Sequence, residues 1–149
     1  MLQLLKEIIL DAQQGIWFTG TQRSLGVIPV EKKATIIIGV RRCGKTILLN
    51  QVVSRLISEG VSKDNFLYIN FFDDRLAQLK TFGLDKVLEA FFLIYPEKKL
   101  HDKIYCFFDE IQVVTGWESF IDRILRTENC EVYITGCLQK CFQKRLVLK

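Results

Sequence analysis

The stretch ATIIIGVRRCGKTILL, residues 34–49, constrains the fold of this chain more than any other part of its sequence. It starts with a β-branched run, which is typical of a buried strand. Residues 45–58 follow with apolar side chains at helical spacing, and Gly60 stands just past the predicted helix end. Between strand and helix, Gly39 to Thr46 fits the pattern G-x-x-x-x-G-K-[ST] in the context that this pattern requires.

The two glycines of this pattern allow backbone angles that a Cβ atom would forbid. The loop N–H groups can then point at phosphate oxygens, and the helix N-terminus adds partial positive charge. Lys45 would reach the β- and γ-phosphates, and the Thr46 hydroxyl would ligate Mg²⁺. The alternative is a chance match in an ordinary strand-to-helix turn. The predicted nucleotide-binding residues are Gly39, Val40, Arg41, Arg42, Cys43, Gly44, Lys45, Thr46 and Ile47.

Predicted strands and helices alternate along the chain, which is typical of an α/β fold with a mainly parallel sheet. An amphipathic helix is expected at residues 2–14, and further helices before Pro96 and over WESFIDRILRT. The other strands are FLYINFF, KIYCFFDE and CEVYITG. We expect one domain over residues 1–149: an N-terminal helix and loop (1–33), a nucleotide-binding core (34–136) and an atypical tail (137–149).

An acidic pair ends the third predicted strand. A phosphate-binding loop requires a second element, an apolar strand that ends in an acid, and IYCFFDE supplies it at Asp109. Asp109 would hold the Mg²⁺ shell directly or through water. Glu110 would orient and polarise the water that attacks the γ-phosphate. The alternative is that the pair merely ends a strand and faces solvent.

Composition excludes several other classes of protein. No apolar run approaches the length that crosses a bilayer, and charges interrupt the apolar start, so we expect a cytoplasmic protein without a membrane anchor. Five cysteines without a C-x-x-C pair, and a single histidine, give no zinc-like cluster. The net charge of +4 resides in the tail, so the neutral body gives no support for a nucleic-acid partner.

The acidic pair also separates nucleotide classes by resemblance. Ras-type GTPases carry D-x-x-G and an N-K-x-D base reader, whereas this chain has DEIQ and no N-K-x-D. The pair resembles the glutamate-dependent ATPase branch of P-loop proteins, which favours ATP over GTP. That branch places a polar residue on the strand between the phosphate-loop and Asp-Glu strands. Thr135 stands there, either to position the attacking water or as an ordinary strand residue.

Four segments in this order, IIIGVRRCGKTILL, YINFFDDRL, CFFDEIQVVTGWESF and VYITG, resemble one family. It comprises bacterial and archaeal AAA-superfamily ATPases whose P-loop domain precedes a C-terminal domain of unknown function. The resemblance implies a three-layer P-loop NTPase sandwich, with strand 4 between strands 1 and 3 and strand 2 outside. It makes residues 39–46 the Walker A loop and Asp109 the Walker B acid, and it implies hydrolysis of ATP with Mg²⁺. A homo-oligomer of the full-length protein is compatible with it.

The resemblance covers further residues whose chemistry it leaves open. Arg41 and Arg42 fall in the phosphate loop, and Asp73 and Asp74 follow the second strand. Trp117 follows the Asp-Glu strand, where a packing role is expected.

After Gly136 the sequence departs from the family, because CLQKCFQKRLVLK replaces a serine-rich continuation. One choice of codons encodes a family-like segment in another frame, so we expect a frameshift near Cys137 and a truncated product. A fifth strand, a lid and any arginine finger would then be missing, and a finger is worth about 10³- to 10⁵-fold in rate. We therefore expect a marginally folded and slow ATPase. The alternatives are a catalytically silent nucleotide-binding fragment and a nucleic-acid motor or loader.

Overall fold

The computed structural model describes residues 2–15, 33–39, 45–77, 83–99 and 101–137, without the side chains of 38, 39, 45–47 and 137. Strands and helices alternate as the sequence predicts, and the predicted bounds of three helices are confirmed to the residue. The longer helices are α1 (Leu2–Gln14), α2 (Lys45–Ser58), α4 (Asp85–Ile94) and α5 (Trp117–Thr127). The strands are β1 (Ala34–Gly39), β2 (Phe66–Asn70), β3 (Ile104–Asp109) and β4 (Cys130–Cys137).

The four described strands form one parallel sheet in the order β1-β4-β3-β2. This confirms the predicted order, with the fourth strand between the first and third and the second outside. Because the strands are parallel, their carboxyl ends meet at one edge of the sheet. In register, Gly39 lies beside Cys137, and Asn70 lies beside Asp109.

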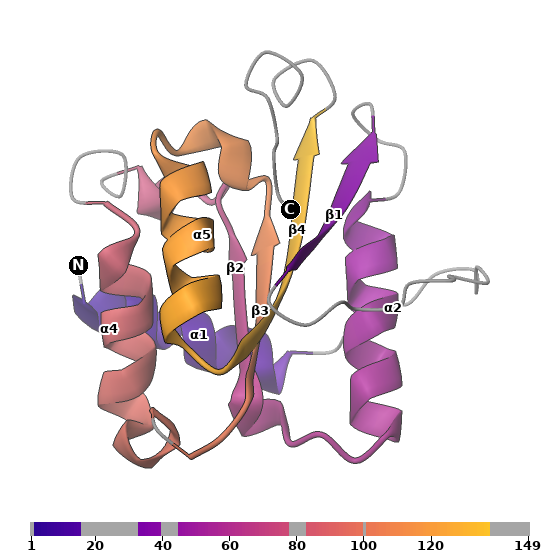
Figure 1. Ribbon diagram of the computed structural model, residues 1–149, viewed down its shortest axis with the longest axis vertical. Coiled ribbons are helices and arrows are strands. Elements are labelled where there is room, and N and C mark those ends of the chain that lie inside the picture. The colour runs from indigo at the N-terminus through magenta and orange to yellow at the C-terminus, as the bar shows by residue number, and fades with distance from the viewer. Residues whose placement is uncertain (1, 16–32, 40–44, 78–82, 100, 138–149) are drawn as a thin grey trace.

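Helices cover both faces of the sheet, as Figure 1 shows, with α2 on one side and α4 and α5 on the other. The core divides accordingly. Phe66, Phe107 and Tyr133 pack with buried residues of α2, whereas Leu67, Phe108 and Ile134 pack in the larger cluster with α1, α4 and α5. Since side chains alternate between faces along a strand, Tyr68, Asp109 and Thr135 lie on the α2 face.

Two strands end earlier than their apolar residues predict. The second strand was expected to continue through Phe72, but it stops at Asn70, whose Oδ1 accepts a hydrogen bond of 3.0 Å from the Phe72 N–H. The third strand was expected to include Glu110, but that residue adopts φ 59° and ψ 42°, in the left-handed region. In both places a local polar contact or backbone turn overrides the strand propensity of the sequence.

Gln13 joins the first helix to the sheet and to α4. Its side chain is 4% exposed, and Nε2 donates to the Phe66 carbonyl at 2.8 Å. Its Oε1 accepts a hydrogen bond of 2.8 Å from the hydroxyl of Tyr95, which follows α4. Both amide atoms of this buried side chain are therefore paired, which fixes the end of α1 over β2.

Replacing Gln13 tests this attachment. Gln13→Ala leaves the Phe66 carbonyl and the Tyr95 hydroxyl without this partner and also creates a cavity, so we expect a loss of about 2–4 kcal/mol in the free energy of unfolding. Urea denaturation measures it. Gln14→Ala is the matched control, because Gln14 is exposed on the same turn of helix. Equal stability of the two variants would contradict the account.

Candidate functional site

The predicted phosphate loop lies only partly within the described residues. Gly39 ends β1, and Lys45 begins α2, as the motif requires. Residues 40–44 lie outside the described residues, and so do the side chains of Lys45, Thr46 and Ile47. The contacts of these residues with phosphate and Mg²⁺ remain predictions from the sequence.

The structure brings the other three predicted site residues together at the carboxyl ends of β3 and β4. The Thr135 hydroxyl donates to Asp109 Oδ1 at 2.5 Å, and its oxygen accepts the Glu110 N–H at 2.9 Å. All three are buried, with exposed fractions of 1% for Thr135, 2% for Asp109 and 8% for Glu110. The alternative of a solvent-facing acidic pair is therefore wrong.

The hydroxyl of Thr135 has one proton and two lone pairs. Its proton is donated to Asp109 Oδ1. One lone pair accepts from Glu110. The hydroxyl therefore fixes both acids relative to each other, a role that the sequence did not predict.

Glu110 has the only non-glycine positive φ among the described residues. Left-handed backbone costs a residue with a Cβ roughly 1–2 kcal/mol, and such residues cluster at functional sites. The turn directs the chain from β3 into the short 3₁₀ turn Ile111–Val113. It also leaves the Glu110 N–H pointing at Thr135 rather than along the sheet ladder.

Tyr68 is a site residue that the sequence analysis missed. Its hydroxyl lies 3.4 Å from Asp109 Oδ2, so each oxygen of that carboxylate has a hydroxyl neighbour. Burial, reinforced by the Asp109 charge and by this hydrogen bond, raises the pKa of Tyr68 above its usual range. The phenol thus keeps its proton and remains a donor. Only the register of β2 on β3 brings it there, and the sequence does not show that register.

Gln112 is the second residue that the analysis missed, although it closes the DEIQ motif. Its Nε2 donates to Glu110 Oε2 at 2.6 Å. It belongs to the 3₁₀ turn that follows Glu110. The glutamate is therefore held at its backbone by Thr135 and at its carboxylate by Gln112.

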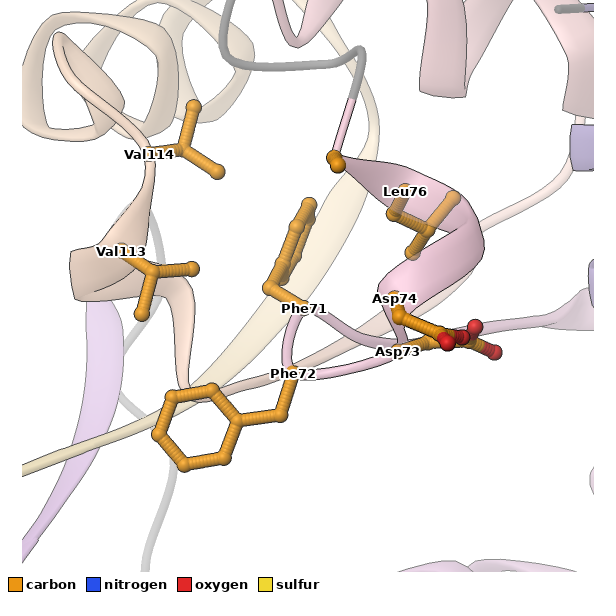
Figure 2. Close-up of a pocket in the computed structure, with 8 residues that line it drawn as sticks. Phe71, Phe72, Asp73, Asp74, Leu76, Val113 and Val114 are labelled. Carbon is orange, nitrogen blue, oxygen red and sulfur yellow. The ribbon is translucent and has the colours of Figure 1, made fainter.

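An apolar hollow of about 240 Å³ lies at the same end of the sheet, beyond β2. Figure 2 shows the Phe71 ring between Val113 and Leu76, with the carboxylates of Asp73 and Asp74 directed away from it. Its lining residues follow β2 and β3, so it lies at the side of the sheet away from β1.

Two residues that the family resemblance left without chemistry have local structural contacts here. The Asp73 carboxylate accepts the Arg75 backbone N–H at 3.0 Å and its guanidinium at 2.7 Å, and the pKa of Asp73 is lowered chiefly by that hydrogen bonding. Trp117 is 1% exposed at the start of α5, so the expected packing role is confirmed.

The donor set at the strand ends consists of oxygen ligands, the kind that magnesium takes. Among the described residues no group of three histidine, cysteine or acidic side chains could hold a metal ion by itself. Magnesium needs no such cage, because one or two carboxylates with water and substrate phosphates suffice. A buried carboxylate held by two hydroxyls, as Asp109 is, suits that mode of binding.

An α/β sandwich with this strand order, a glycine-rich loop after β1 and an acid at the tip of β3 defines the class of P-loop nucleotide-binding domains. Within that class the family is also clear. A family model described as an AAA domain matches residues 31–147, and the chain belongs to that family. Its membership indicates nucleotide binding and confirms the resemblance seen in the motifs.

Two curated proteins are similar to this chain. An uncharacterized protein of Methanocaldococcus jannaschii is 35% identical over 124 residues, which are 83% of this chain and 25% of that protein. An uncharacterized protein of Haemophilus influenzae is 35% identical over 105 residues, 68% of this chain and 24% of that protein. The chain thus spans about a quarter of the length of these relatives. No solved structure gives a significant match. Across the described residues, no helix has both the length and the apolarity to cross a membrane.

Thr135→Val tests the link between the two acids. Valine has nearly the same shape but leaves the Glu110 N–H and Asp109 Oδ1 buried without this partner, which we expect to cost about 2–4 kcal/mol in the free energy of unfolding. Thr135→Ser is the matched control, because it keeps the hydroxyl and loses one methyl group, at about 1 kcal/mol. Urea denaturation measures the free energy of unfolding of both variants. If Thr135→Val is as stable as Thr135→Ser, the hydroxyl does not hold the site.

Proposed function

We propose that this chain is the Mg-ATP-binding domain of an AAA-family ATPase. The observation that carries the proposal is the Thr135 hydroxyl, which holds Asp109 and Glu110 together at the carboxyl ends of the strands. Asp109 and Thr135 lie on the sheet face that α2 covers, and α2 is the helix that follows the glycine-rich loop. Phosphates bound at that loop would therefore face the acidic pair.

The two acids receive different roles in this proposal. Asp109 is almost fully buried and accepts hydrogen bonds on both oxygens, which fix its carboxylate in place to hold the magnesium shell. Glu110 lies after the strand end, with its carboxylate directed by Gln112. It orients the attacking water and accepts its proton as the water oxygen bonds to the γ-phosphorus, while the bond from that phosphorus to the β–γ bridging oxygen breaks and ADP leaves.

Magnesium, when bound, neutralises the negative charge that develops on the β- and γ-phosphate oxygens. Thr46 and Asp109 are the residues of this chain that would hold it. Lys45 would contact the same phosphates as a point charge. ATP rather than GTP is proposed because DEIQ stands where a Ras-type GTPase has D-x-x-G.

Lys45→Ala tests nucleotide binding. The substitution removes the one charge expected on the β- and γ-phosphates, and we expect the affinity for Mg-ATP to fall at least about tenfold. Isothermal titration calorimetry measures it, with circular dichroism to establish folding. Lys63→Ala, an exposed lysine before β2, is the control and should bind as the parent does. Equal affinities of both folded variants would refute the assignment of residues 39–46.

Glu110→Gln tests the division of roles between the two acids. Glutamine keeps the shape of the side chain but cannot take a proton, so we expect hydrolysis to fall by about 10²-fold or more while ATP binding persists. Single-turnover hydrolysis and calorimetry measure the two quantities. Glu89→Gln, on the exposed side of α4, should leave both unchanged. A Glu110→Gln variant with the parental hydrolysis rate would mean that another group is the base.

A further inference from the structure

Gln112 carries a buried amide oxygen that has no hydrogen-bond partner among the described residues. The other end of the same amide, Nε2, donates to Glu110 Oε2 at 2.6 Å. Among the described residues, the side-chain amide of Gln112 is thus hydrogen-bonded only through Nε2, to the glutamate.

The side-chain amide of Gln112 makes its described hydrogen bond to one acceptor, the carboxylate of Glu110. A hydrogen bond to a charged group restricts the carboxylate more strongly than a neutral pair would.

The backbone geometry increases the need for such a restraint. Glu110 lies at φ 59°, where the chain has left the sheet ladder. Thr135 fixes only its N–H. Gln112 follows two residues later in the turn Ile111–Val113, so its side chain can reach back to the carboxylate.

We infer that Gln112 is the positioning residue for Glu110: its side-chain N–H fixes one carboxylate oxygen, so that the carboxylate is oriented toward the water that attacks ATP. This inference rests on the proposed function. In this role Gln112 acts through the glutamate and not on the phosphate itself. Its removal should therefore lower kcat and leave the binding of ATP unchanged.

Two variants remove the donor. Gln112→Met keeps the length of the side chain and loses the amide, whereas Gln112→Glu keeps the shape and places a second carboxylate beside Glu110. We expect kcat of ATP hydrolysis to fall about ten- to hundredfold in both, because a hydrogen bond to a charge is lost. KM and the calorimetric affinity for Mg-ATP should stay within about twofold of the parent.

Gln3→Met is the matched control. Gln3 is an exposed glutamine of α1 whose Nε2 lies 3.5 Å from Glu7 Oε1, so it forms the same kind of pair far from the site. The control should match the parent in every measurement. Urea denaturation and circular dichroism should show Gln112→Met folded under the assay conditions, so that a lower kcat does not reflect unfolding. A purely structural residue would lower the fraction of folded protein and leave kcat per folded molecule at the parental value.

A double-mutant cycle on kcat decides whether Gln112 acts through Glu110. In the Glu110→Gln background, Gln112→Met should change the rate by less than about twofold. The inference would be overturned if kcat of Gln112→Met equalled or exceeded that of the parent, or if only KM changed. It would also be overturned if Gln112→Met lowered kcat equally in both backgrounds. Each of these results would leave the proposed function intact. A parent that binds Mg-ATP but shows no hydrolysis in single-turnover assays would overturn the proposed function, and this inference with it.

Discussion

The hydroxyl of Thr135 is the interaction on which the rest of the site depends. It donates to Asp109 and accepts from the backbone of Glu110, so one oxygen atom joins two strands and two acids. The bond to Asp109 fixes a carboxylate that burial would otherwise disfavour. The bond to Glu110 stabilises a left-handed turn that has an intrinsic cost. Without that turn the chain would continue along β3, and Glu110 would not keep its present position.

The order of strands explains why a residue so late in the chain can do this. Strand β4 lies between β1 and β3. On one side, Thr135 of β4 lies beside Ile37 of β1; on the other side, β4 pairs with β3, which ends in Asp109. Ligands of open α/β sheets bind where the carboxyl ends of the strands meet and the strand order changes direction. The glycine-rich loop and the acidic pair leave the sheet at that edge. The strand order that holds the sheet together therefore also places the residues of the site.

Some of this could be predicted from sequence and some could not, for physical reasons. Helices α1, α2 and α5 were predicted to the residue, because apolar periodicity and flanking turn residues are local signals. The ends of β2 and β3 were not predicted correctly, although their residues favour strands. The Asn70 side chain ends β2 and the backbone turn at Glu110 ends β3. The motifs singled out Asp109, Glu110 and Thr135, and the structure brings these three residues together. Tyr68 and Gln112 were missed, since the first depends on strand register and the second on the shape of one turn.

The most direct test of this account is a crystal structure of the chain with Mg²⁺ and a non-hydrolysable ATP analogue. The account predicts the triphosphate on the loop of residues 39–46 and the metal shell against Asp109. It also predicts an ordered water between the γ-phosphate and Glu110, with Thr135 still bonded to both acids. A nucleotide bound away from that loop would contradict the account. So would a structure in which the Glu110 carboxylate faces away from the γ-phosphate and Asp109 contacts no part of the metal shell.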